Sequence, residues 1–365
     1  MVVYLILTIG TIGLASLTVP EEGPGSRAQA LNRTVCLAVF LLLFAVSALR
    51  YRVGNDYWWY TEIMHEIGVM HHPGAHGIVP TEPLFNGIVW LIYNATGTEN
   101  YLLVFALMSF LTAAGFVYVI RRQSVNFFLS FTMFLLLCFY FQSFSTVRYY
   151  AAMPLALMAL PYVKKGDWPR VLLFVIVGGL LHKTLFAVLL LYPLAKVKWN
   201  RVVVAAGLAV CVLVLLFSSR VMELAFLLYP TWRNAWNIEV SFSVLNVARC
   251  VLVLLFVLWN ARRETEIGTD AEIVMLTKMT VMALALHVFA WFIPQLSRIT
   301  YYLIIPQIFL VPRVLSHVRD ARARKLQTAL VLAACLLYFA RYMLHAGDDG
   351  ILVLPYRSFL FSVTE

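Results

Sequence analysis

The chain has 365 residues, of which 62% are hydrophobic and only 13% charged. A soluble globular domain carries about 25% charged residues, so this composition excludes an ordinary soluble protein and predicts a polytopic membrane protein. The formal net charge of +10 comes from short basic clusters between apolar segments, as the positive-inside rule produces, so it does not indicate nucleic acid as a partner. The five cysteines lie within apolar segments and lack metal-ligand spacing, which indicates neither disulfides nor a zinc site.

Apolar segments suited to transmembrane helices recur along the chain. Because a spanning helix needs about 20 mostly apolar residues, they predict an all-α helical bundle of about 10–13 transmembrane segments, including re-entrant or broken helices. We expect one transmembrane domain over residues 1–365. The candidate spans are 2–19, 34–49, 101–120, 126–142, 144–162, 201–217, 241–259, 272–292, 299–315 and 327–342.

Three further apolar segments, 84–95, 171–195 and 351–361, are short or interrupted. Basic residues near span ends favour the cytoplasmic side. More than half of the 28 basic residues fall on one side if 84–95 stays at the surface and 171–195 forms a hairpin, broken at Gly178-Gly179 and His182-Lys183. We therefore predict this hairpin, and an outer-face loop with a short helix over residues 50–100.

Arginines and aromatic residues gather on the predicted outer face. Arg148 is the most informative, because its own span has no carboxylate at helical spacing to pair with it. A charge at membrane depth costs at least ~2.5 kcal/mol and usually faces a cavity or a partner. Arginine side chains bind phosphate oxygens bidentately, so the group indicates a phosphate ligand. The other arginines of this group are Arg50, Arg52, Arg233 and Arg298.

Simpler roles exist for several of these residues. Arg50 and Arg52 can extend from the end of a span toward water. Trp58 and Trp59 suit either a membrane-interface belt or a stacking platform for sugars. The histidines and glutamates of residues 62–76 lack an H-E-x-x-H pattern, so we expect a solvated loop there and no metal.

Three titratable residues are candidates for acid–base chemistry. Asp56 follows a Gly-Asn turn pair, and it can act on substrate or pair with Arg52. Glu82 precedes Pro83, and it can act on substrate or complement the dipole of a helix starting there. His182 lies in a broken apolar segment, where a histidine serves either as a proton carrier or as a backbone-bonded structural group.

These residues carry a family resemblance. They form an R-x-G-x-D-Y run from Arg52 to Tyr57, E-P-L-F from Glu82 to Phe85, a central Arg148, H-K-T from His182 to Thr184, and a late R-x-x-Y-Y from Arg298 to Tyr302. In order and spacing the chain resembles the EpsG family of Wzy-like exopolysaccharide polymerases. It departs from the pattern at Tyr149, where a glutamine is expected after the central arginine, which leaves the partner of Arg148 open.

The resemblance implies a glycosyltransferase that polymerises repeat units carried on polyprenyl (undecaprenyl) diphosphate into exopolysaccharide, capsule or O-antigen. The expected location is the bacterial inner membrane, with the active face toward the periplasm or cell exterior. A lipid diphosphate is the leaving group, and neither a metal nor another cofactor is expected because arginines neutralise it. Expected partners are the lipid-linked glycans, the bilayer and a polysaccharide chain-length regulator.

The roles that follow are hypotheses. Arg148, Arg298 and Arg52 are expected to bind diphosphate, and Asp56 or His182 to take the proton of the acceptor hydroxyl, with Glu82 as second choice. Further expected substrate-binding residues are Tyr57, Lys183, Arg233 and Tyr302.

Two other functions compete with this one. A translocase of lipid-linked oligosaccharides is expected to carry repeated halves and broken helices in pairs, and the chain shows no internal repeat. Another multi-span polyprenyl-dependent glycosyltransferase is expected to carry acidic residues soon after its first span, whereas here the acidic loop follows the second.

Overall fold

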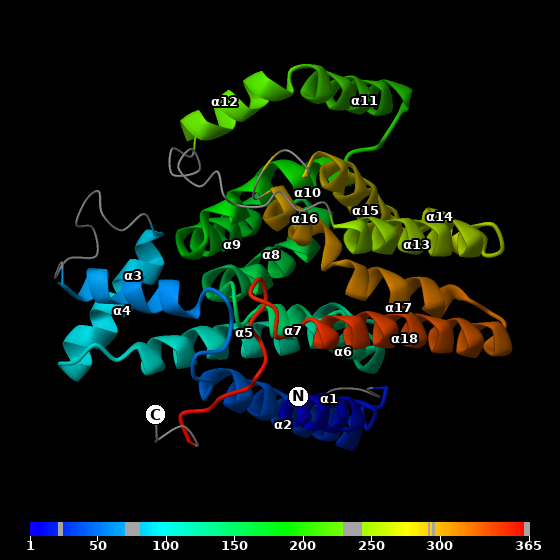
Figure 1. Cartoon of the computed structure of the whole chain (residues 1–365). Coiled ribbons are helices and arrows are strands. Elements are labelled where there is room, and N and C mark those ends of the chain that lie inside the picture. Colours follow the sequence, from blue (N-terminus) through cyan, green and yellow to red (C-terminus); the bar gives the residue numbers. More distant parts are fainter. Residues whose placement is uncertain (21–24, 70–80, 229–242, 291–292, 294–295, 361–365) are drawn as a thin grey trace. The chain divides into compact units, whose positions relative to one another are not determined.

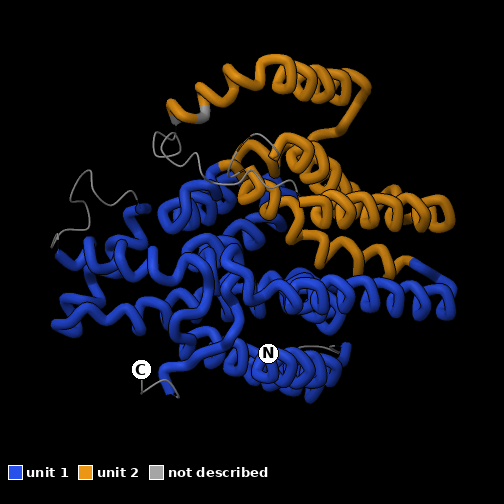
Figure 2. The backbone as a smooth tube through the Cα atoms, in the orientation of Figure 1, with its two compact units in different colours: residues 1–186, 318–365 blue, residues 187–317 orange. Residues whose placement is uncertain are grey.

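The structure is a computed structural model that describes residues 1–20, 25–69, 81–228, 243–290, 293 and 296–360 (Figure 1). Within these residues the chain is almost entirely helical and has no strand, which confirms the predicted all-α class. The chain folds into two compact units, one made of residues 1–186 and 318–365 and the other of residues 187–317 (Figure 2).

The first unit holds the N-terminal helices and the last helix of the chain. They are α1 (Val2–Ala15), α2 (Arg27–Ala48), α3 (Tyr57–Val69), α4 (Pro83–Thr96), α5 (Tyr101–Gln123), α6 (Phe127–Leu136), α7 (Phe139–Gln142), α8 (Val147–Lys165), α9 (Trp168–Leu181) and α18 (Ala321–Leu344). Helix α8 packs between α5 and α9, and α4 contacts α3, α5 and α9.

The second unit follows a 3-10 turn, η1 (Lys183–Ala187). Its helices are α10 (Val188–Lys196), α11 (Arg201–Leu216), α12 (Ser218–Leu228), α13 (Val244–Ala261), α14 (Thr265–Thr269), α15 (Ala271–Phe289), α16 (Leu296–Ile304) and α17 (Gln307–His317). Helix α15 is the centre of this unit and packs against α10, α13, α16 and α17.

Among the described helices, six segments are long and apolar enough to cross a membrane. They are 27–48, 101–123, 244–261, 271–289, 296–317 and 321–344, and the shorter apolar helices α1, α6 and α9 accompany them. The chain is therefore a multi-pass membrane protein. Helices α11 and α12 form one further candidate, bent by 87°.

In two predicted segments the helix breaks differ from those expected from the sequence. The segment 126–142 is not one helix, because Cys138 adopts a left-handed conformation (φ 62°) that ends α6 and starts the short α7. Helix α9 runs through Gly178-Gly179 without interruption and ends at His182, whose backbone is extended. The two glycines allow the chain to fold back, since a Cβ on Gly178 would lie 2.5 Å from Leu185 and one on Gly179 would lie 2.4 Å from Phe186.

The segment 351–360 is not a span. It runs as extended chain beside residues 49–55, with a bridge between Arg50 and Ser358. Backbone hydrogen bonds join Tyr51 N–H to the Arg357 carbonyl (3.0 Å) and Gly54 N–H to the Leu352 carbonyl (2.8 Å). The C-terminal segment therefore supplies the backbone partners that a loop at the end of a helical bundle otherwise lacks.

Arg50 does not extend toward water as a span-end arginine would. Its side chain is buried, with only 1% of the residue exposed, between the rings of Phe105 (5.2 Å) and Phe144 (5.1 Å). One of its guanidinium nitrogens donates to the hydroxyls of Ser47 and Ser109, at 3.0 Å each. Arg50 is thus a structural cation that links α2, α5 and the residues before α8.

Gly54 is the tightest point of the loop that leads into α3. Its φ is +101°, a conformation that side-chain-bearing residues avoid. A Cβ there would lie 2.3 Å from the carbonyl oxygen of Phe144. The glycine of the R-x-G-x-D-Y run is therefore needed because two backbone segments touch at this position.

We predict that Gly54→Ala lowers the stability of the first unit far more than Gly97→Ala. Gly97 also has a positive φ (+67°) but meets no atom within 4 Å, so its replacement costs only the conformational strain of about 1–2 kcal/mol. Thermal unfolding of the purified variants in detergent measures the difference. Equal midpoints for the two variants would contradict the contact with Phe144.

Candidate functional site

Arg148 stands at the centre of the polar residues of the first unit. It is the second residue of α8, and only 6% of it is exposed. Its guanidinium carbon lies 5.4, 5.6 and 5.2 Å from the ring centres of Trp59, Tyr60 and Phe85, within the range of cation–π attraction. Tyr60 also accepts a hydrogen bond from the Arg148 backbone N–H (3.4 Å), one of the donors that a helix start leaves unpaired.

Glu82 supplies the negative charge that balances Arg148. The two side chains form a buried, hydrogen-bonded ion pair, with 8% of the Arg148 side chain and 7% of the Glu82 side chain exposed. The second carboxylate oxygen of Glu82 accepts a hydrogen bond from the Lys183 backbone N–H (3.1 Å). One carboxylate therefore connects α4, α8 and the turn after α9.

The E-P-L-F motif now has a physical explanation. Glu82 is the N-cap of α4 in an extended conformation, and Pro83 occupies the first helical position, where its missing N–H costs nothing. The Glu82 side chain makes no capping hydrogen bond, so it is directed to Arg148 and not to its own helix. Phe85 lies three residues later, on the same face, and packs its ring on the same guanidinium.

His182 lies at the break after α9 and is buried, with 5% exposed. Its ring contacts that of Tyr149, the neighbour of Arg148, edge to face at 5.2 Å. Nδ1 receives the backbone N–H of Thr184 at 3.4 Å and lies 3.0 Å from the Thr184 hydroxyl. An N–H can only donate, so neutral His182 carries its proton on Nε2. The H-K-T motif thus fixes the tautomer through its threonine and holds Glu82 through the backbone of its lysine.

The R-x-G-x-D-Y run enters α3. Asp56 is half-buried, and its carbonyl accepts the Tyr60 N–H at 3.0 Å, so Asp56 lies one helical turn from the ring that contacts Arg148. Arg52 is exposed, with its guanidinium carbon 4.8 Å from the ring centre of Trp58. Tyr57 is buried and stacks on Phe105 (4.8 Å). Burial raises the pKa of Tyr57 to about 12, so its hydroxyl stays protonated.

Lys183, Arg298 and Tyr302 are the other predicted residues that the structure describes. Lys183 has an exposed side chain, and its backbone is the part that contacts Glu82. Arg298 and Tyr302 lie on α16 of the second unit, where Tyr302 is buried and its carbonyl accepts the Tyr192 hydroxyl at 3.3 Å. Arg233 lies outside the described residues. The structure therefore brings together Glu82, Arg148 and His182, with Asp56 one turn away from Tyr60.

Two features of this site were missed from the sequence. The pairing of Arg148 with Glu82 joins residues 66 positions apart, and no helical spacing reports such a pair. The rings of Trp59, Tyr60 and Phe85 come from two helices that meet only in the folded chain. The available signal was Arg148, a charge in an apolar span that needs a partner.

The part of the predicted loop that the structure describes is helical up to Val69, in α3, and holds one of the histidines, His65. No group of three His, Cys, Asp or Glu residues is placed to hold a metal there. His65 instead pairs with Glu99 at 2.8 Å, and this hydrogen bond, together with the charge of Glu99, raises the pKa of His65. His71, His72 and His76 lie outside the described residues.

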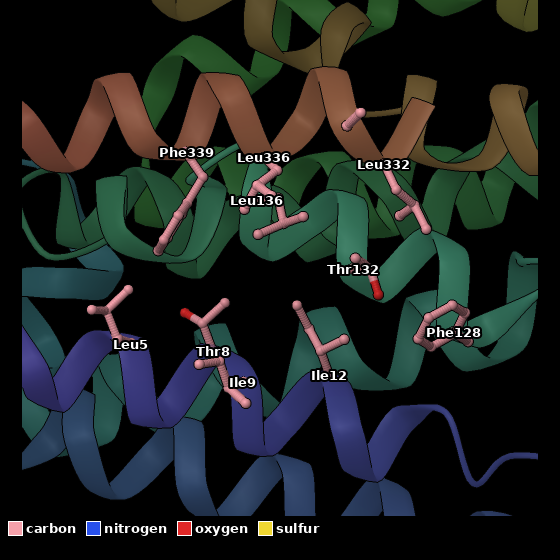
Figure 3. Close-up of a pocket in the computed structure, with 11 residues that line it drawn as sticks. Leu5, Thr8, Ile9, Ile12, Phe128, Thr132, Leu136, Leu332, Leu336 and Phe339 are labelled. Carbon is pink, nitrogen blue, oxygen red and sulfur yellow. The ribbon is translucent and has the colours of Figure 1, made fainter. Parts of the chain in front are cut away.

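An apolar cavity of about 350 Å³ lies elsewhere in the first unit, between α1, α6 and α18 (Figure 3). Its only polar lining side chains are Thr8 and Thr132, whose hydroxyls are buried and have no hydrogen-bond partner among the described residues. A cavity without a charged or titratable group can hold hydrocarbon but offers no acid–base chemistry. The candidate functional site is therefore the group around Arg148, hereafter the Arg148 site: Glu82, Arg148 and His182 with the rings of Trp59, Tyr60 and Phe85.

We predict that the Arg148–Glu82 pair is strongly coupled. Arg148→Met or Glu82→Gln alone leaves a buried charge without its partner and costs about 3–5 kcal/mol, whereas the double variant leaves neither charge and loses less than the sum. Thermal unfolding of the four proteins measures the coupling.

The Arg170–Asp167 pair is the matched control. It is a surface pair at 3.3 Å, with 62% of the Arg170 side chain exposed, so its removal costs about 0–1 kcal/mol. Additive losses for Arg148→Met and Glu82→Gln would contradict the buried ion pair.

A sequence model of the EpsG family matches residues 33–358, a range that runs from α2 to the C-terminal extended segment and includes every residue of the Arg148 site. Neither the curated proteins nor the solved structures compared with the chain give a match. The family match covers most of the chain, and the chain therefore belongs to the EpsG family.

Proposed function

We propose that this protein polymerises glycan repeat units carried on polyprenyl diphosphate, at the outer face of the bacterial inner membrane. EpsG is a family of glycosyltransferase-like exopolysaccharide polymerases, which supports the coarse activity. The lipid diphosphate, the membrane and the face are parts of the proposal. The observation that supports it best is Arg148, a buried arginine whose Nε has no hydrogen-bond partner among the described residues.

A diphosphate suits the surroundings of Arg148. The guanidinium carries five N–H donors, and Glu82 occupies only part of them. The start of α8 adds the positive end of a helix dipole, which favours negative charge. The aromatic rings around Arg148 exclude water and so strengthen its attraction for an anion. A lipid diphosphate entering here gains hydrogen bonds that the protein alone does not satisfy.

In this mechanism the sugar carbon that bears the lipid diphosphate is attacked by a hydroxyl of the incoming repeat unit. The bond between that carbon and the diphosphate oxygen breaks, and a new glycosidic bond forms. The hydroxyl loses its proton to a protein base, and the diphosphate leaves as an anion that Arg148 stabilises. Arg52 and Arg298 remain candidates for additional contacts to the diphosphate.

The three candidate bases differ in their contacts. Glu82 accepts hydrogen bonds from Arg148 and the Lys183 backbone, so its role here is to position Arg148. His182 keeps Nδ1 occupied by Thr184, and its Nε2–H suits donation to a phosphate oxygen. Asp56 is half-buried at the start of α3, one turn from Tyr60. We propose Asp56 as the proton acceptor, because it starts the helical turn that ends at Tyr60, whose ring contacts Arg148.

We predict that Arg148→Lys severely reduces polymer formation without loss of the protein. Lysine keeps the charge opposite Glu82 but lacks the planar fork that binds phosphate oxygens, so elongation should fall about 100-fold. Polymer length and amount are measured by gel in cells that carry the variant as their only copy. Membrane levels of the protein are compared by immunoblot.

Arg170→Lys is the control, because Arg170 is exposed and far along α9 from His182. Wild-type polymer from the Arg148→Lys strain, at an equal protein level, would remove Arg148 from the diphosphate site.

A further inference from the structure

Helix α3 exposes its two largest side chains. Trp58 and Trp59 are 56% and 45% exposed, although the same helix buries Tyr57, Tyr60 and Met64 in the core beside α4, α5 and α8. Exposing two adjacent tryptophans forfeits the burial that stabilises most aromatic residues. Exposed apolar groups bordered by polar residues are typical of a binding surface.

The neighbours of the two tryptophans indicate that this surface faces water. Residues three or four apart share a helix face, so Trp58 and Trp59 both lie beside Glu62, and Glu66 follows Glu62 one turn later. Glu62 is exposed, and His65, one turn further, is exposed and paired with Glu99. Such charges are costly in lipid. Helix α3 is also not among the segments suited to cross the membrane. These charges favour a polar ligand on this surface over lipid hydrocarbon.

The same surface is continuous with the Arg148 site. The guanidinium carbon of Arg148 lies 5.4 Å from the Trp59 ring centre. The guanidinium carbon of Arg52 lies 4.8 Å from the ring centre of Trp58 and 4.9 Å from that of Tyr51. A ligand group held on the two tryptophans is thus next to the place where we propose the diphosphate binds.

We propose that Trp58 and Trp59 form a sugar-binding subsite of the Arg148 site, occupied by an oligosaccharide repeat of the lipid-linked substrate. This inference rests on the proposed function. Pyranose rings present C–H groups that pack on flat aromatic faces, and their hydroxyls donate to carboxylates such as Glu62 and Glu66. Arg52, whose guanidinium lies over the Trp58 ring, supplies N–H donors. The surface therefore offers both the apolar and the polar contacts that a neutral or acidic sugar requires.

The test compares variants that keep or remove the aromatic faces. Trp58→Leu/Trp59→Leu retains apolar side chains without rings, and Trp58→Phe/Trp59→Phe retains rings. Trp259→Leu is the control, because Trp259 is 54% exposed and has the Arg263 guanidinium carbon 4.4 Å from its ring centre, in the second unit. Each protein is purified into nanodiscs and titrated with oligosaccharides of one to three repeats, made by partial acid hydrolysis of the secreted polysaccharide.

We expect the double Leu variant to bind these oligosaccharides about 10–100-fold more weakly than wild type, since two stacking contacts are lost. The double Phe variant should stay within about threefold, because the ring faces remain, and Trp259→Leu should bind as wild type does. Equal binding by the double Leu variant and wild type would overturn the subsite. A double Phe variant that binds as weakly as the double Leu variant would overturn it too.

The outcome separates this inference from the proposed function. A wild-type protein that binds no oligosaccharide while its cells still extend the polymer would sink the subsite and leave the polymerase intact. The opposite result has two parts: the double Leu variant loses binding, and cells that lack this protein never bring their repeats to the outer face. This result would keep the subsite and reject the polymerase.

Discussion

The buried ion pair of Arg148 and Glu82 is the constraint on which the described site depends. Each charge would be costly alone in a low-dielectric interior, so the pair requires both partners to be held together. Because Glu82 also accepts the Lys183 N–H, one carboxylate fixes the starts of α4 and α8 and the turn after α9. Three short motifs, far apart in the sequence, thereby meet at one guanidinium.

Backbone contacts elsewhere in the first unit support this arrangement. The C-terminal segment runs beside the loop that precedes α3, and Gly54 touches the carbonyl of Phe144, four residues before Arg148. The Arg50 guanidinium lies next to this contact, between the rings of Phe105 and Phe144. The entry to α3 and the entry to α8 are therefore held against each other, which keeps Tyr60 and Trp59 on the Arg148 guanidinium. The positions of the residues in the Arg148 site therefore depend on contacts between several helices and loops, and not on one helix alone.

Much of the fold was predictable because hydrophobic runs report membrane spans locally. The all-α class, the short helix after Pro83 and the break at His182 all follow from composition and from Gly, Pro and His positions. The long-range pairing of Glu82 was not predictable, since a sequence period describes one helix and says nothing of which helix lies opposite. The extended segment 351–360 was also not predictable, because its apolar residues resemble a short span until its backbone partners are known.

The side of the membrane on which lipid-linked repeats accumulate tests the account most directly. The measurement uses a strain that lacks this protein, gel separation of its lipid-linked glycans, and a sugar-cleaving probe that cannot cross the membrane. We predict single repeats at the outer face, because export continues while the Arg148 site is missing. Single repeats protected at the inner face would contradict the polymerase and make a translocase of lipid-linked glycans the better explanation.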